Sequence, residues 1–166
     1  PLSPRFVVPA RKVGKTDTRA AGAICEAVGR PNMRYVSVKS VEQQAVCSLH
    51  TGRQFLVVQR TALINHCRGL LTEFGIIMPL GADKVRRLFA EILDDEQSTV
   101  PLLLKDLLQQ HLQDLARLEY RIEAIDKQLA EWAKTNQQAM TLLQMLGVGV
   151  ITATAFAAGV CDPKLF

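Results

Sequence analysis

The chain has 166 residues, of which 48% are apolar, 22% charged and 5% aromatic, and this balance is typical of a folded protein rather than a disordered one. The formal net charge of +4 hides an asymmetry, because residues 1–70 carry 11 Lys and Arg against 3 Asp and Glu, while residues 71–166 carry 9 against 13. A basic first part favours a polyanionic partner such as nucleic acid; an ordinary basic surface is the alternative.

Membrane, secretory and zinc-binding classes are disfavoured. No apolar run reaches the roughly 18–20 residues that span a bilayer, and no segment has the pattern of a signal peptide. None of the four cysteines forms a CxxC pair and the three histidines are scattered. We therefore expect a cytoplasmic protein with reduced thiols and no membrane contact. Because the chain begins with Pro1, we expect a fragment, or a chain whose start was removed.

The first forty residues predict short elements joined by basic segments. Residues 6–8 predict a short strand, followed by a connector that carries Arg11, Lys12 and Lys15. Thr16 and Asp17 are good helix caps, and the helix that they open should end at Gly29. Residues 35–38 predict a second short strand.

A long helix is predicted from Ser40 to Gly75. Ser40 and Gln43 fit a capping box, and the helix should be roughly 50 Å long. The apolar residues at helical spacing are Ala45, Leu49, Gly52, Leu56, Leu63, Cys67, Leu70 and Phe74. The opposite face is expected to carry four potential phosphate-binding or polar groups, namely His50, Arg53, Arg60 and Arg68.

Two more helices follow. One is predicted over 82–93, with Val85, Leu88, Phe89 and Ile92 facing inward. The next begins near Pro101 and carries a nearly heptad seam of Leu104, Leu108, Leu112, Leu115, Leu118, Ile122, Ile125, Leu129 and Trp132. The two long helices are therefore predicted to form an antiparallel coiled coil, within one chain or between two. Such a seam is a packing device and carries no chemistry.

A glycine turn lies near the end of the chain. Gly147 and Gly149 separate an apolar helix end from a helix of small residues, which is the layout of a helix-hairpin-helix. Glycines allow positive φ, and the first amides of the next helix can bind a phosphate. Plain helix packing is the alternative, because two helices joined by a glycine turn are common in helical proteins. Helix-hairpin-helix turns also usually carry Pro where this chain has Leu146.

Several of these segments occur together in one known family. They are Lys15–Asp17, Ala23–Val28, Arg30–Arg34, Val38–Gln44, Arg68–Gly75 and Leu146–Ala153. In their order and spacing the chain resembles the DEDD transposases of the "one-hundred-and-ten" insertion sequences, whose relatives act as RNA-guided recombinases.

The resemblance implies a mainly α fold in three parts. Residues 1–40 would be the end of a RuvC-like α/β domain, residues 41–136 a long antiparallel helical coiled-coil region, and residues 137–166 the start of a helix-hairpin-helix-like transposase domain. The family's nucleophilic serine would lie beyond Phe166, and two of its four metal-binding acids before Pro1.

The resemblance also implies a site and partners. Its metal motif places two acids three residues apart to bind Mg²⁺; Asp17 matches the first, and Ala20 replaces the second. Asp17 is thus a weak, incomplete metal ligand, or simply part of a helix start. DNA, a guide RNA and further copies of the chain are the implied partners, in the bacterial nucleoid. We expect a transposase fragment that is inactive alone; the alternative is a non-catalytic helical protein that binds nucleic acid or partner helices. The expected nucleic-acid contacts are Arg11, Lys12, Lys15, Arg53, Arg60, Arg68, Gly147 and Gly149.

Overall fold

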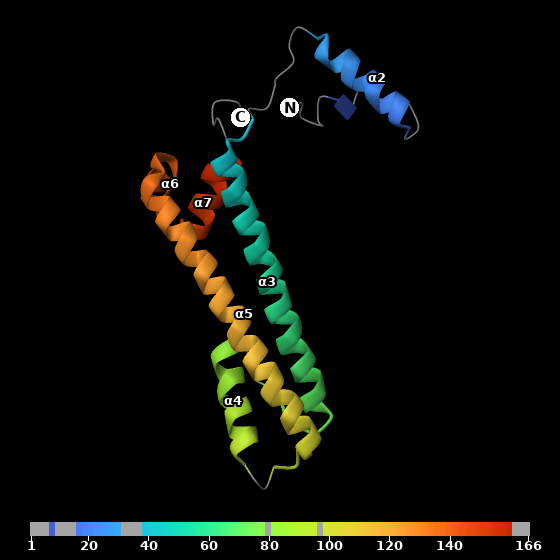
Figure 1. Ribbon diagram of the computed structural model, residues 1–166, viewed down its shortest axis with the longest axis vertical. Coiled ribbons are helices and arrows are strands. Elements are labelled where there is room, and N and C mark those ends of the chain that lie inside the picture. Colours follow the sequence, from blue (N-terminus) through green and yellow to red (C-terminus); the bar gives the residue numbers. More distant parts are fainter. Residues whose placement is uncertain (1–6, 9–15, 31–37, 79–80, 96–97, 161–166) are drawn as a thin grey trace.

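The structure is a computed structural model that describes residues 7–8, 16–30, 38–78, 81–95 and 98–160 (Figure 1). Helices account for nearly all of the regular structure in these ranges, and no strand occurs among them. The mainly α prediction is confirmed to that extent.

The two short strands predicted near the start are not found in the described residues. Val7 and Val8 are helical, so the strand predicted over 6–8 is wrong at these two positions. Val38 belongs to no regular element, and the other residues of the second predicted strand lie outside the described ranges. The physical reason is that a short β-branched run forms a strand only when it pairs with another one.

The helix α2 (Asp17–Val28) begins where the sequence predicts. Thr16 is the N-cap, and its hydroxyl accepts a hydrogen bond from the Arg19 amide at 3.4 Å. Asp17 occupies the first turn, where a negative charge interacts favourably with the helix dipole. The helix ends at Gly29.

The capping box of α3 (Val41–Thr72) is confirmed. The Gln43 amide donates to the Ser40 hydroxyl at 3.0 Å, and the Ser40 amide donates to the Gln43 side chain at 2.9 Å. Gly75, just past the helix, has φ +73°, a conformation that glycine adopts without strain. Both ends of this helix are therefore set by local sequence.

The second long helix, α5 (Leu102–Thr135), runs antiparallel to α3 along most of its length (Figure 1). Its four buried large side chains recur at intervals of seven residues: Leu108, Leu115, Ile122 and Leu129. The predicted seam is thus confirmed as the buried face of α5.

The predicted apolar stripe of α3 is only partly correct. The buried residues are Val46, Leu56, Cys67 and Leu71, whereas Ala45 is exposed. Phe74, predicted as the end of the stripe, lies beyond the helix and is 38% exposed. Large apolar side chains such as Phe55 and Val58 also occur on exposed faces of α3, so the packing against the facing helix decides which apolar residues are buried.

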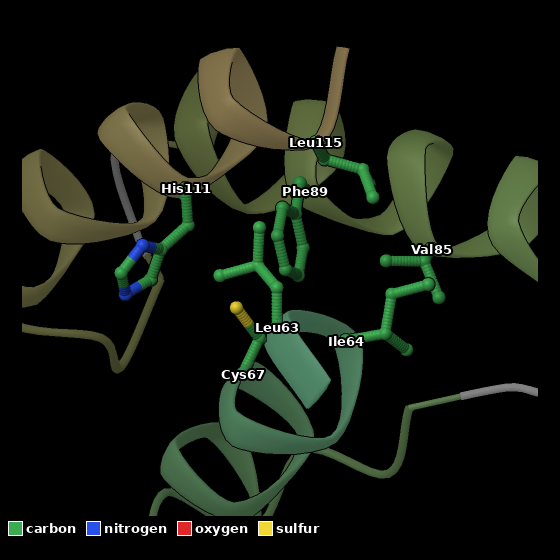
Figure 2. A pocket seen from close by; sticks show the side chains of 7 residues that line it. All are labelled: Leu63, Ile64, Cys67, Val85, Phe89, His111 and Leu115. Atoms are coloured by element: carbon green, nitrogen blue, oxygen red, sulfur yellow. The ribbon is translucent and has the colours of Figure 1, made fainter. Parts of the chain in front are cut away.

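The helix α4 (Ala82–Asp94) packs against α5 and covers the part of the core that lies between the end of α3 and the start of α5. Val85, Phe89 and Ile92 are buried as predicted. Figure 2 shows side chains of α3, α4 and α5 converging on a small apolar pocket that includes Cys67 and His111. Burial raises the pKa of the Cys67 thiol to about 11, so this thiol stays protonated at neutral pH.

The last two helices fold back against the long pair. Asn136 ends α5 and caps α6 (Gln137–Leu143) by accepting a hydrogen bond from the Ala139 amide at 3.0 Å. The helix α7 (Val150–Gly159) packs against α3, α5 and α6. Its small buried residues, Ala153, Thr154, Ala157 and Ala158, let the backbones approach closely. None of the described helices is both long and apolar enough to cross a lipid bilayer.

Candidate nucleic-acid interface

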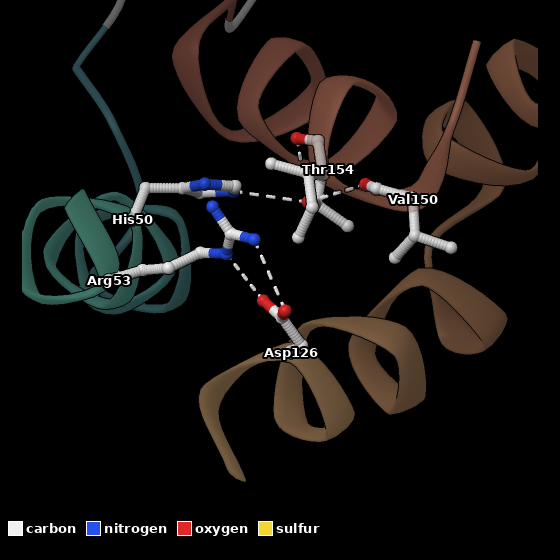
Figure 3. Close-up of polar contacts among 6 residues, drawn as sticks. His50, Arg53, Asp126, Val150 and Thr154 are labelled. Carbon is white, nitrogen blue, oxygen red and sulfur yellow. Dashed lines mark hydrogen bonds and ion pairs between the residues drawn. The ribbon is translucent and has the colours of Figure 1, made fainter. Parts of the chain in front are cut away.

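A polar cluster joins α3, α5 and α7 (Figure 3). The Arg53 guanidinium contacts both oxygens of Asp126, with Nε–Oδ1 at 2.5 Å and Nη2–Oδ2 at 3.2 Å. His50 Nε2 lies 3.0 Å from the hydroxyl of Thr154, which is fully buried. The cluster therefore links α3 to α5 through Arg53 and Asp126, and α3 to α7 through His50 and Thr154.

The hydrogen-bond pattern around Thr154 fixes the state of His50. The Thr154 hydroxyl has one proton, and it donates to the backbone carbonyl of Val150 at 2.8 Å or of Ile151 at 3.2 Å. It must then accept from His50, so Nε2 carries a proton. Burial lowers the pKa of His50, and the nearby Arg53 lowers it further, while Asp126 partly opposes them. A neutral imidazole with Nε2–H meets all these conditions.

Two further side chains of α3 bind the end of α7. The Gln43 amide donates to the carbonyl of Ala157 at 3.5 Å, and the Cys47 thiol to that of Ala158 at 3.6 Å. Together with His50 they form one row along α3. Gln43 and Cys47 contact Ala157 and Ala158 in the last turn of α7, whereas His50 contacts Thr154 in its middle, so the start of α7 lies toward the middle of α3.

This row positions the glycine turn. Gly147 has φ +85°, as the sequence predicts for the sharp bend. Gly149 was expected to share that property, but its φ is −87° and it serves as the N-cap of α7 in an extended conformation. Its place in the turn needs no positive φ because the bend is completed at Gly147. Both glycines are exposed, and no side chain caps the first turn of α7.

The arginines expected on the outer face of α3 lie in different surroundings. Arg53 is on the side that faces α5, and Asp126 offsets its charge. Arg60 is half-buried on α3, and Arg68 is half-buried with its guanidinium donating to the Asn65 side chain at 2.5 Å. Arg60 has no hydrogen bond or ion pair to the described residues, and Arg68 is bound only by a neutral amide, so both have more free charge than Arg53 to offer a phosphate. Arg11, Lys12 and Lys15 lie outside the described residues.

The predicted metal-binding position is on α2. Asp17 is exposed and Ala20 half-buried, and their spacing of three residues places them on the same side of that helix. Within the described residues, no group of three or more His, Cys, Asp or Glu side chains could hold a metal ion. Mg²⁺ binding at Asp17 stays a prediction.

Two members of the polar cluster were missed by the sequence analysis. Asp126 and Thr154 lie 73 and 104 residues from their partners in α3, so no local spacing links them. Asp126 occurs among the outer residues of a heptad helix, where an acid is ordinary. Only the register between α3 and α5 turns it into the partner of Arg53.

The chain is similar over nearly its whole length to bacterial proteins named as transposases, two of them transposases of insertion sequence elements. It is 41% identical over 166 residues to the "Probable family 20 transposase" of Pseudomonas aeruginosa, covering 99% of this chain and 49% of that protein. It is 37% identical over 163 residues to the transposase for insertion sequence element IS1328 of Yersinia enterocolitica, covering 98% and 48% respectively.

A third relative gives the same result. The chain is 37% identical over 165 residues to the transposase for insertion sequence element IS1111A of Coxiella burnetii, covering 99% of this chain and 45% of that protein. The chain thus spans about half the length of the curated relatives it matches. Neither a family model nor a solved structure matches it.

Proposed function

We propose that the chain is a segment of an insertion-sequence transposase, in which it contacts nucleic acid and supplies a helical assembly surface. The observation that carries this proposal is the identity of 37–41% to three named transposases across essentially every residue of the chain. In the whole enzyme, DNA would be bound and its strands exchanged. A guide RNA and a second copy of the chain are the other proposed partners.

The proposed nucleic-acid surface combines two features of the described residues. The first turn of α7 leaves backbone amides without side-chain caps beside the exposed Gly147 and Gly149, and such amides attract phosphate. Arg60 and Arg68 on α3 add positive charge. The polar row from Gln43 to His50 supports this role because it holds α7 firmly on α3.

The proposed metal chemistry concerns α2. In a DEDD transposase, carboxylates hold two Mg²⁺ ions that stabilise the attacking and leaving oxygens of a phosphodiester. Asp17 fits one ligand position, whereas the Ala20 methyl cannot bind a cation. We infer that this segment supports Mg²⁺-dependent chemistry poorly, even inside a whole enzyme.

A chimera tests the proposal. The segment of the Pseudomonas relative that aligns with this chain is replaced by this chain, and movement of a reporter element is counted in cells. We expect the chimera with Ala20→Asp to move the element and the unmodified chimera to be at least ~10-fold less active, because a second carboxylate restores metal binding. The matched control adds Asp17→Ala to the Ala20→Asp chimera and should abolish movement.

Two outcomes count against the proposal. A folded Ala20→Asp chimera that never moves the element contradicts the transposase assignment. Equal activity with and without Ala20→Asp contradicts the metal role of this position.

The second candidate is a non-catalytic helical protein that binds nucleic acid or partner helices. It is favoured by the use of Arg53, His50, Asp126 and Thr154 in internal contacts rather than in an open reactive site. This candidate predicts nucleic-acid binding by the purified chain together with an inactive Ala20→Asp chimera.

A further inference from the structure

An open groove of about 350 Å³ runs between the two long helices. Its lining residues are Gln59 and Leu63 of α3 with Asp114, Arg117, Leu118 and Arg121 of α5. The groove is therefore lined by one amide, one carboxylate and two guanidinium groups, together with two leucines that add apolar surface.

The groove contains two cations on successive turns of α5. Arg117 and Arg121 are four residues apart, so their side chains leave the same side of the helix. Arg117 forms an ion pair with Asp114 at 3.3 Å, but the two side chains are 74% and 51% exposed and the pair is strongly screened by water. Arg121 has no hydrogen bond or ion pair to the part of the chain that the structure describes. The groove can thus offer two guanidinium groups to an anion.

Exposed aromatic side chains flank these cations. Tyr120 is 74% exposed, three residues after Arg117 on α5. Phe55 is 61% exposed, four residues before Gln59 on α3. Helical spacing places Tyr120 beside Arg117 and Phe55 beside Gln59. Neither ring contributes to the buried core, so both are available to a ligand.

We propose that this groove binds a single strand of nucleic acid. Arg117 and Arg121 contact phosphates, and unpaired bases stack on Tyr120 and Phe55. Cations that follow the backbone together with aromatic stacking platforms are what a single strand requires. A duplex hides the faces of its bases, so it would leave both rings exposed. The inference rests on the proposed function for the presence of nucleic acid, and it adds the place and the strandedness.

Binding is measured with the purified 166-residue chain and three labelled oligonucleotides of one sequence: single-stranded RNA, single-stranded DNA and duplex DNA. We expect Arg117→Gln/Arg121→Gln to weaken single-strand binding by about 10-fold or more and to reduce its salt dependence, since two phosphate contacts are lost. Tyr120→Ser should weaken it by at least ~5-fold through lost stacking. Duplex binding should change less than about 2-fold in these variants, because the duplex does not use this groove.

The matched control is Lys127→Gln/Lys134→Gln, which removes two positive charges from α5 outside the groove. These lysines pair with Glu123 and Glu131, so the control should leave single-strand binding nearly unchanged. All of the variants alter exposed side chains, and circular dichroism checks that each one folds. Stronger loss with RNA than with DNA would identify RNA as the strand, and the reverse would identify DNA.

The proposal is overturned if the groove variants bind single strands as the parent does, or if they lose duplex binding to the same extent. In the first case an acidic protein partner becomes the better occupant. Duplex binding retained with no effect of the groove variants defeats this inference alone. Absence of binding to all three oligonucleotides defeats it together with the nucleic-acid part of the proposed function.

Discussion

The Arg53–Asp126 pair shows how one contact can change the role of a residue. Arg53 was expected to meet nucleic acid, yet its guanidinium forms two hydrogen bonds across the interface of α3 and α5. The hydrogen bond to Asp126 is the main reason why the pKa of Arg53 is raised. A charge held in this way contributes to helix pairing more than to ligand binding.

We expect Arg53→Met to destabilise the fold by about 1–2 kcal/mol, because Asp126 would be left partly buried without its partner. This is less than for a fully buried pair, since the side chains are 25% and 35% exposed. A double-mutant cycle with Asp126→Asn, followed by urea unfolding, measures the coupling free energy. Additive losses from the two single variants would show that the pair contributes no stability of its own.

Two histidines predict how stability depends on pH. Burial lowers the pKa of His111, and so does the nearby His66, whose ring makes an edge contact with it at 5.4 Å between centroids. Burial also lowers the pKa of His50. The folded state therefore resists protonation that the unfolded state accepts near pH ~6.5. Stability is full above that pH and decreases as pH falls below it.

The thermal midpoint should thus drop between about pH 7 and about pH 5, where carboxylates remain mostly ionised. His111→Gln should remove part of this drop, because it removes one of the groups that must stay neutral. A midpoint that is constant or rises over this interval would rule out the assigned direction of these pKa shifts.

At the scale of elements, the seam of α5 could be predicted from sequence and its partner surface could not. Leu108, Leu115, Ile122 and Leu129 repeat strictly, and only one face of the helix is strongly apolar. In α3 the buried side also includes Arg53, so a prediction from polarity alone places this arginine on the exposed face. The contact with Asp126 depends on the register between two helices, which local sequence does not specify.

The helix caps could be predicted because they depend only on residues that are close together in the sequence. Ser40 and Gln43 interact within four residues, and Gly75 and Gly147 are needed where the backbone has positive φ. The candidate site was predicted in part: the glycine turn was found, whereas its attachment through His50 and Thr154 was not. That attachment joins residues 104 positions apart.

Ile122→Asp tests the seam. Ile122 is 6% exposed between the long helices, so a carboxylate there should cost several kcal/mol and abolish much of the cooperative unfolding. Gln128→Asp adds the same charge to an exposed position of α5 and should change stability by less than about 0.5 kcal/mol. If thermal melting showed similar midpoints for both variants, the seam would not hold the helices together.

At the scale of the whole molecule, two long antiparallel helices form a frame to which α4 and α7 are attached near opposite ends (Figure 1). The frame places the glycine turn of α7 beside α3 and leaves Arg60 and Arg68 on the same long helix. Proteins named as transposases are similar to this chain, and on the proposed function nucleic acid is what the frame holds. We propose that this frame binds the phosphate backbone of nucleic acid.

The most direct test is the affinity of the purified chain for a short DNA duplex as salt is raised from about 50 to about 200 mM. Released counterions should make log affinity fall linearly with log salt, by about 0.9 per phosphate contacted. Arg60→Gln/Arg68→Gln should weaken binding and make this slope shallower by about 2. The control Lys84→Gln/Arg87→Gln, on α4, should leave the slope unchanged. Affinity that ignores salt, or a slope that the Arg60 and Arg68 changes do not alter, would contradict the account.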